Sequence, residues 1–263
     1  MQGNVEFATL LPQSTMPAMA LFSLPDFRVR ADEPELMDDL ALGGATIRQT
    51  LDQLAVVNRL LGGHIAWQGV RQVLRHSPGG QPLELADLGC GGGDSLRQIA
   101  RWAKAAGVPL RLIGFDANPH VVAYAREKSH AYPSIRYEVA DITSDAFLQR
   151  RFDLLTASLV LHHFDHPTLA HLLPAYLRMA TRGLVISDLQ RHWLPWSLFA
   201  LVTRLCGASP MIRHDGLLSV RRGFTQAELR AMLTTHADAY TLRWRWAFRY
   251  LAVAKRKRDV GAR

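Results

Sequence analysis

Acidic and histidine side chains follow a series of short apolar runs in this sequence of 263 residues. Asp87 and Asp116 end two of these runs, and His162 and His163 follow another. A carboxylate can accept hydrogen bonds from both hydroxyls of a ribose, and such charge-assisted hydrogen bonds are strong. Histidine titrates near neutral pH, which suits it to remove a proton from a hydroxyl. These residue types therefore indicate a site that places a ribose-containing ligand beside a proton acceptor.

A glycine-dense turn follows the first of these runs, within residues 83–95. Gly89, Gly91 and Gly93 let the backbone take positive φ values and approach a ligand with no Cβ in the way. The helical pattern that opens at Ser95 would aim a partly positive helix end at a ligand carboxylate or phosphate. The spacing fits neither a dinucleotide fingerprint nor a P-loop, because Asp94 stands where a third glycine is required and no lysine follows.

Apolar runs alternate with helical patterns through the middle of the chain. We expect strands at 83–88, 110–116, 135–140, 152–157 and 183–188. We expect the intervening helices at 95–106, 119–128 and 167–180. This alternation predicts an α/β fold with a doubly wound parallel sheet, in which ligands bind beyond the carboxyl ends of the strands. The side chains expected at those ends are Asp87, Asp116, Asp141, Ser158 and Asp188.

Two motifs in this frame resemble those of a known family. The series Asp87-x-Gly89-x-Gly91-x-Gly93 resembles motif I of the class I S-adenosylmethionine (SAM)-dependent methyltransferases. The run Leu161-His162-His163 resembles their motif IV, in the form common among small-molecule methyltransferases of ubiquinone and menaquinone biosynthesis. The resemblance covers residues 83–188. It implies a Rossmann-like, mostly parallel, seven-stranded sheet that binds SAM and releases S-adenosylhomocysteine (SAH).

The same resemblance implies which residues contact SAM. Asp116 would hold the ribose and Asp141 the adenine amino group, while Arg59, on a helix above the cofactor, would reach the methionine carboxylate. A solvated helix face is the alternative interpretation of Arg59. The implied cofactor residues are Asp87, Gly89, Cys90, Gly91, Gly93, Ser95, Asp116, Ala117, Asn118, Asp141, Ile142, Ser158, Leu159 and Arg59. No metal site is predicted.

Methyl transfer from SAM requires an acceptor held in line with the S–CH₃ bond, the exclusion of water and, for a hydroxyl, removal of a proton. A phenol titrates at about 10, so a histidine base is expected. The candidate bases are His163, His162 and His214. The expected substrate contacts, in the apolar stretch after Asp188 and the segment that follows it, are Trp193, Trp196, Phe199 and Arg213.

Residues 57–64 and 213–222 also resemble segments of bacterial methyltransferases associated with polyketide-type secondary metabolism. This resemblance implies O-methylation of a small, apolar, hydroxylated acceptor that is phenolic or polyketide-like. C-methylation of a quinone-precursor-like aromatic needs almost the same groups and stays open. A further hypothesis keeps the fold and methylates RNA, and another has a non-catalytic SAM-binding protein.

The chain divides by composition into successive segments. They are a disordered leader at 1–31, an N-terminal helical lid at 32–80, a SAM-binding core at 81–190, an apolar substrate-side insertion at 191–223, a C-terminal helix and edge hairpin at 224–254, and a basic tail at 255–263. A capping box at residues 225–228 would open the C-terminal helix. The apolar insertion is too short to span a bilayer, but it could form a homodimer interface or contact a membrane surface.

The composition limits the partners and the compartment. Thirty-one Lys and Arg against 23 Asp and Glu give a net charge of +8, with one basic cluster at residues 255–258. The arginines are otherwise scattered and no nucleic-acid motif is present, so we expect a small-molecule partner rather than a nucleic acid. Two cysteines, one of them in the cofactor turn, fit a reducing compartment and predict a cytoplasmic protein.

Overall fold

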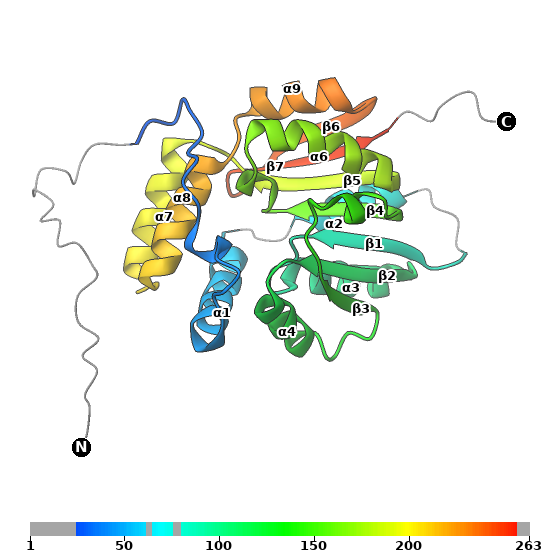
Figure 1. Cartoon of the computed structure of the whole chain (residues 1–263), viewed down its shortest axis with the longest axis horizontal. Helices are drawn as coiled ribbons and strands as arrows, with labels where there is room; N and C mark the ends of the chain where they lie inside the picture. The colour runs from blue at the N-terminus through cyan, green and yellow to red at the C-terminus, as the bar shows by residue number, and fades with distance from the viewer. Residues whose placement is uncertain (1–24, 62–64, 76–79, 257–263) are drawn as a thin grey trace, which may run out of the picture.

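The computed structural model describes residues 25–61, 65–75 and 80–256 (Figure 1). The expected leader up to residue 24, the helix stop at Gly62 and Gly63, the turn at 76–79 and the basic tail beyond residue 256 lie outside the described residues. No helix in the described part of the chain is long and apolar enough to cross a membrane.

A single seven-stranded sheet forms the centre of the molecule, in the order β3-β2-β1-β4-β5-β7-β6. The strands are β1 (Leu83–Leu88), β2 (Leu110–Asp116), β3 (Ile135–Val139), β4 (Phe152–Ser158), β5 (Ala180–Leu189), β6 (Ala239–Arg245) and β7 (Arg249–Lys255). β1 to β5 pair in parallel, and the hairpin of β6 and β7 joins β5 antiparallel. The predicted doubly wound, mostly parallel sheet with an edge hairpin is therefore confirmed.

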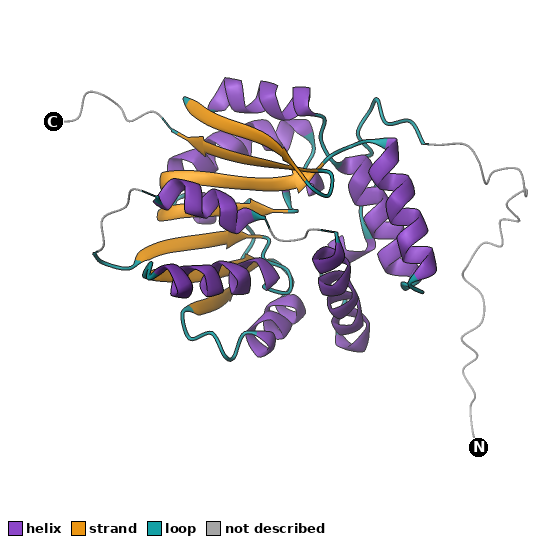
Figure 2. Ribbon diagram, turned by 180° about the vertical axis from the view of Figure 1, so that it is seen from behind, coloured by secondary structure: helices purple, strands orange, loops and turns teal. Residues whose placement is uncertain are grey.

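Helices cover both faces of the sheet, as Figure 2 shows from behind. The helices on one face are α2 (Ala66–Leu74), α3 (Asp94–Ala106) and α4 (Pro119–Lys128), whose apolar sides pack on one core cluster. The helices on the other face are α5 (Asp145–Leu148), α6 (His166–Met179) and α9 (Gln226–His236), which pack on the second cluster. Because both faces are covered, the central strands are rich in apolar residues, which made them visible in the sequence.

Three further helices lie beyond the carboxyl ends of the strands, on the left of Figure 1. They are α1 (Gly44–Leu60), α7 (Trp193–Leu205) and α8 (Pro210–Arg222), with α7 and α8 side by side. The sequence predicted α1 and the apolar stretch of α7, but not α8. Charged residues interrupt the apolar pattern of α8, since Asp215 and Arg222 are buried by polar contacts rather than exposed.

The segment before α1 crosses this end of the sheet and is held by side chains from distant parts of the chain. Arg30 donates to the carbonyl oxygens of His162 and Phe164, each at 3.0 Å, and Ala31 N–H donates to the carbonyl of Arg221. Residues 25–31 thus pack on the fold, although the sequence assigned them to a leader. Their anchors lie more than 130 residues away, so no local pattern could show them.

Candidate functional site

One cavity of about 570 Å³ opens between the carboxyl ends of the strands and the covering helices. Its floor is the glycine turn after β1 together with the ends of β2 and β4, and its roof is α1, α7 and α8. The volume is in the range of pockets that hold small organic ligands. The sheet therefore brings the expected residues to one place, as the topology predicts.

The floor has the features that a ribose-containing ligand requires. Gly89 and Gly91 take φ values of +60° and +51°, and a Cβ on Gly91 would enter open space at the cavity wall. Asp116 accepts the N–H groups of Gly91 at 3.1 Å and Asn118 at 3.0 Å, which fixes its carboxylate at the end of β2. Burial raises the pKa of Asp116, and the hydrogen bonds from these N–H groups oppose that shift.

Leu159 closes the floor at the end of β4. It lies at the cavity wall with a φ of +58°, a left-handed conformation that is strained for a residue other than glycine. Its N–H donates to the carbonyl oxygen of Ser187 at 2.8 Å, which ties the end of β4 to β5. Together with Ala117 and Ile142, Leu159 gives the floor an apolar surface on which an adenine ring could pack.

Asp87 lies beneath this floor rather than on it. Its carboxylate is buried and accepts a hydrogen bond from Thr156 Oγ1 at 2.5 Å. Burial raises the pKa of Asp87 to about 7, Thr156 opposes the shift and Asp116 adds to it. The first acid of motif I is thus placed to support the turn from below, and the cavity wall begins at Gly89.

An Asp87→Asn variant is expected to be more stable than the native protein, and more so at pH 8 than at pH 5. The raised pKa means that protonated Asp87 stabilises the fold fully below about pH 4, and that this contribution is lost as the pH rises through about 7. Asparagine removes the penalty, on the order of 2–4 kcal/mol at pH 8, and still accepts from Thr156. Thermal melts of the SAM-free protein measure the effect, with exposed Asp145→Asn as control. An equal gain at both pH values would contradict this.

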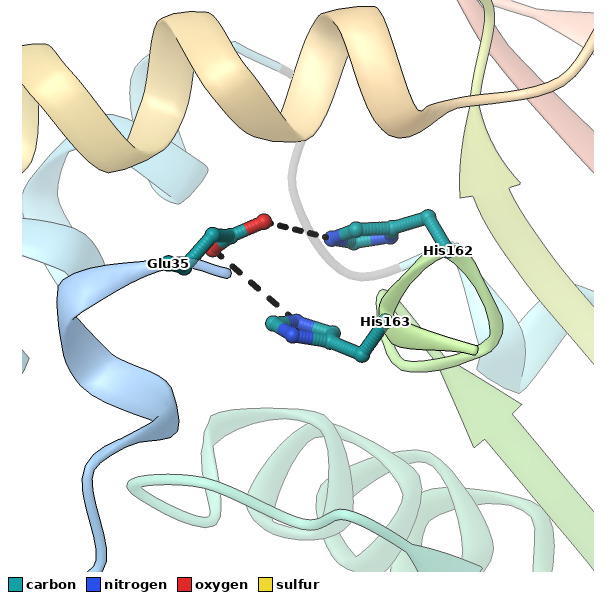
Figure 3. Close-up of side chains that lie close together, drawn as sticks. All are labelled: Glu35, His162 and His163. Carbon is teal, nitrogen blue, oxygen red and sulfur yellow. Dashed lines mark ion pairs between the residues drawn. The ribbon is translucent and has the colours of Figure 1, made fainter. Parts of the chain in front are cut away.

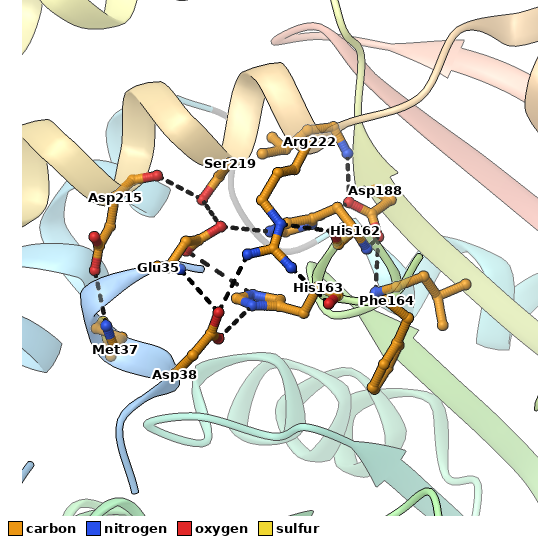
Figure 4. A network of polar contacts seen from close by, with 12 residues as sticks. Glu35, Met37, Asp38, His162, His163, Phe164, Asp188, Asp215, Ser219 and Arg222 are labelled. Atoms are coloured by element: carbon orange, nitrogen blue, oxygen red, sulfur yellow. Dashed lines mark hydrogen bonds and ion pairs between the residues drawn. The ribbon is translucent and has the colours of Figure 1, made fainter. Parts of the chain in front are cut away.

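The cavity also contains a buried polar cluster around the two histidines of motif IV (Figures 3 and 4). His162 Nδ1 lies 2.6 Å from Asp188 Oδ1, and both residues are buried. On its other side, His162 Nε2 lies 3.6 Å from Glu35 Oε1. His163 Nδ1 lies 2.7 Å from Asp38 Oδ1, and its Nε2 lies 4.0 Å from Glu35 Oε2. Glu35 thus faces both imidazoles.

The charges in this cluster affect one another strongly. Burial alone would raise the pKa of Asp188, but the charge and hydrogen bond of His162 outweigh it and hold the pKa below its ordinary value. Burial also opposes ionisation of Asp38, but His163 lowers the pKa of that carboxyl to about 2. Burial raises the pKa of Glu35, against the effects of His163 and of Ser219, which donates to it at 2.8 Å.

Arg222 and Asp215, both on α8, hold the cluster together. Arg222 donates to the carbonyl oxygens of His162 and His163 and to Asp38 Oδ2. Asp215 accepts the N–H groups of Leu36 at 2.9 Å and Met37 at 3.0 Å, in the short 3₁₀ helix η2 (Leu36–Asp38). The helix that the sequence did not predict therefore fixes both the histidine loop and the segment that carries Glu35.

The remaining walls are mostly apolar. α1 contributes Leu51, Leu54 and Val57, and α7 contributes Phe199 and Val202. Arg249, buried at the start of β7, is a cation at this wall, and its Nη2 donates to Asn58 Oδ1 at 3.0 Å. Burial lowers the pKa of Arg249 to about 10, and the Asp188 carboxylate opposes that shift.

Several of the predicted residues come together at this cavity. Those that line it are Gly89, Gly91, Asp116, Ala117, Asn118, Asp141, Ile142, Leu159, His162, His163 and Phe199. Cys90, Gly93, Ser95 and Ser158 support the floor from positions that are not part of its lining, as Asp87 does. Burial raises the pKa of the Cys90 thiol well above its ordinary value, as expected for a packed and unreactive side chain.

Other predicted residues lie away from the cavity. Arg59 and Arg213 are exposed, Trp193 is about half exposed, and Trp196 packs edge-on against Phe27. His214 is exposed too, and Asp215, the carboxylate beside it, binds η2 as well as His214 Nδ1. A shift of about two residues, roughly half a helical turn, moves a side chain to the opposite face, and the sequence could not fix the rotation of α1 or α8.

Among the polar residues of the cavity that the sequence did not reveal are Glu35, Asp38 and Arg249. Glu35 lies 127 and 128 positions before the two histidines, so spacing gave no signal. The sequence placed both acidic residues in the ordered lid at 32–80, and they form a reciprocal capping arrangement around η2, but no local pattern indicated that they reach the cavity.

Comparison with known proteins identifies the class. Residues 85–183 match the family model described as a methyltransferase domain. With the sheet order and the glycine turn described above, this part of the chain is a class I SAM-dependent methyltransferase domain, whose cofactor is SAM. The expected family is thus confirmed for this region.

Relatives and solved structures extend the comparison. The chain is 31% identical over 139 residues to a trans-aconitate 2-methyltransferase of Methylobacterium nodulans, across 52% of this chain and 50% of the relative. It spans only about half, or less, of the length of the curated relatives it matches. An O-methyltransferase family protein from Burkholderia thailandensis shares the fold, with a TM-score of 0.60 at 13% identity, across 88% of this chain and 66% of that one.

A third similar protein is the plantazolicin methyltransferase BpumL in complex with SAH. Its TM-score is 0.58 at 15% identity, and the match covers 81% of this chain and 90% of that one. At such identities the likeness extends to the fold alone, so the acceptor must be inferred from this chain's own cavity.

Proposed function

We propose that this protein transfers the methyl group of SAM to a small, apolar, hydroxylated acceptor. One observation carries the proposal, namely that Asp116 of the floor and His162, which is paired with buried Asp188, line the same cavity, whose other walls are mostly apolar. A SAM-binding domain alone would not require a buried histidine–carboxylate pair beside the cofactor, so the arrangement favours an enzyme over a non-catalytic binding protein.

The residues of the floor fit SAM. Asp116 is placed to accept from the ribose hydroxyls, and Gly91 leaves open space where a side chain would obstruct the ligand. When bound, SAM supplies a methyl group on a sulfonium, which is a good leaving group. The chain's own tasks are to orient the acceptor, to exclude water and to take up a proton.

His162 is the residue we propose as the base. Its Nδ1 is engaged by Asp188, which fixes the ring and leaves Nε2 directed toward the cavity cluster. A buried carboxylate on the far nitrogen stabilises the imidazolium that forms when Nε2 takes a proton. His163, another base candidate from the sequence, pairs with Asp38, which is partly exposed and therefore less enclosed than Asp188. The acceptor hydroxyl would lie beside His162 Nε2, with its apolar body between α1 and α7.

The test is a screen with labelled SAM against phenols, polyketide-like hydroxyaromatics, quinone precursors and total RNA. Transfer to a hydroxylated aromatic or polyketide-like oxygen is expected, and mass spectrometry of the product identifies the methylated atom. Transfer to carbon would replace the O-methylation proposal by C-methylation. SAH binding without product from any pool would favour the non-catalytic alternative.

A Leu54→Trp variant is expected to raise the KM for an apolar acceptor about tenfold or more. Leu54 faces the cavity from α1, and the larger ring would fill space that the acceptor needs, at a cost on the order of 1–3 kcal/mol. Steady-state kinetics measure the KM for the acceptor, and calorimetry with SAH shows whether cofactor binding has changed. Val56→Trp is the matched control, because Val56 is exposed on the same helix and does not line the cavity. A similar KM in both variants would place the acceptor elsewhere.

A further inference from the structure

We propose that Glu35, His162 and His163 form a binding site for a divalent transition-metal ion of the Zn²⁺ type. His162 Nε2 lies 3.6 Å from Glu35 Oε1, and His163 Nε2 lies 4.0 Å from Glu35 Oε2. One ligand atom from each residue lies within 4.8 Å of the other two. A tetrahedral zinc ion with bonds of about 2.0–2.1 Å needs its ligands about 3.3–3.5 Å apart, so a modest rotation of these side chains would close the site around an ion.

The positions of the other ring nitrogens support a metal site. Both imidazoles use Nδ1 to contact a carboxylate, His162 with Asp188 at 2.6 Å and His163 with Asp38 at 2.7 Å. Histidines that bind metals almost always donate their second nitrogen to such a group, which fixes the ring and the tautomer. Here that arrangement occurs twice, and it leaves both Nε2 atoms facing Glu35, as Figure 3 shows.

The surroundings suit an ion with one exchangeable ligand. Ser219 donates to Glu35 Oε1 at 2.8 Å and so holds the third ligand. The guanidinium of Arg222 is directed at the carbonyl oxygens of the two histidines and at Asp38 rather than at the space between the ligands. Two histidines and one glutamate are a ligand set that catalytic zinc sites use, with a fourth position left for water or substrate. All three residues line the cavity, so the fourth position would open to it.

Metal binding and the proposed base compete for the same atom. The lone pair of His162 Nε2 would bind the ion and would no longer accept a proton. Excess Zn²⁺ is therefore expected to suppress histidine-dependent methyl transfer, whereas the binding itself does not rest on the proposed function. The sequence predicted no metal site because Glu35 is so distant along the chain from the two histidines.

Calorimetry with ZnCl₂ on the untagged full chain tests the proposal, in a Cys206→Ser background because Cys206 is an exposed thiol that could bind zinc. One Zn²⁺ per chain is expected. Its affinity should fall at least about tenfold in Glu35→Gln and His163→Gln. It should fall about 10- to 100-fold in Asp38→Asn, which weakens the outer contact with His163 and keeps one oxygen to accept from Arg222 and the Glu35 N–H. His171→Gln, on the exposed side of α6, is the matched control and should bind as before.

Two further measurements distinguish loss of the metal ligands from misfolding, and they do not depend on the proposed function. Each variant must still bind SAH, and substitution by Co²⁺ should give the visible absorption of a tetrahedral ion that Glu35→Gln loses. Absence of stoichiometric binding, or binding that persists in Glu35→Gln and His163→Gln, would overturn the metal proposal. Both measurements are made without an acceptor, so they test metal binding even if the methyl-transfer assay fails.

Discussion

Asp116→Ala is expected to weaken SAH binding roughly 100-fold. Asp116 is the carboxylate at the end of β2, at the cavity wall beside Gly91. Losing its charge-assisted hydrogen bonds to the two ribose hydroxyls would cost on the order of 3 kcal/mol. Calorimetry with SAH, with NAD as the comparison ligand, measures the loss directly.

Asp116 also accepts from the N–H groups of Gly91 and Asn118, so a change of fold must be distinguished from a lost ligand contact. Gly91 N–H donates to Oδ2 and Asn118 N–H to Oδ1, so Asp116→Asn keeps an acceptor for one of the two groups. Thermal melts check its fold, and its SAH binding should lie between that of the native protein and that of Asp116→Ala. Asp145→Ala, at an exposed position in α5, is the matched control. Native SAH affinity in Asp116→Ala, or a preference for NAD, would refute the assignment of the cavity floor as the SAM-binding site.

His162→Gln is expected to lower kcat by about 100- to 10,000-fold, the range that general-base catalysis contributes. The affinity for SAH should change little, because the contacts of His162 are with Glu35 and Asp188 rather than with Asp116 or the glycine turn. The variant should also be less stable by about 3–5 kcal/mol, since it leaves the charge of Asp188 buried without its imidazole. Single-turnover rates measure the loss of catalysis, and thermal melts measure the loss of stability.

A double variant, His162→Gln with Asp188→Asn, separates catalysis from folding. It removes the buried charge together with its partner, so it should recover much of the stability and none of the activity. His163→Gln should lose less activity than His162→Gln, because its carboxylate partner Asp38 is one-third exposed rather than buried. Equal losses in the two single variants would assign the base role to the pair and not to His162.

The sequence predicted the sheet well because its signals are local. Each buried parallel strand is a short apolar run, and helices begin at recognisable residues, as α4 does at Pro119 after the Asn118 cap. The carboxyl ends of those strands carry Gly91, Asp116 and His162, and the topology alone brings them to one cavity.

The roof of the cavity was less predictable because its order comes from distant contacts. Glu35 acquires its position from Asp215, which binds the N–H groups of η2 from 178 and 179 residues away. Arg59 and His214 looked suitable by residue type, but the rotation of a helix decides which side chains face inward. The bases that the sequence proposed at 162 and 163 do face the cavity, whereas the one at 214 does not.

The helices that cover the cavity and the residues of its floor occupy separate stretches of the chain. Substitutions in one can therefore be made without altering the other. The floor comes from residues 89–160, while most of the apolar wall comes from α1 and α7, before and after that stretch. Substitutions in the covers could therefore reshape acceptor preference without disturbing the glycine turn or Asp116. A library confined to residues 51–57 and 195–202 would explore new acceptors while retaining the same methyl donor.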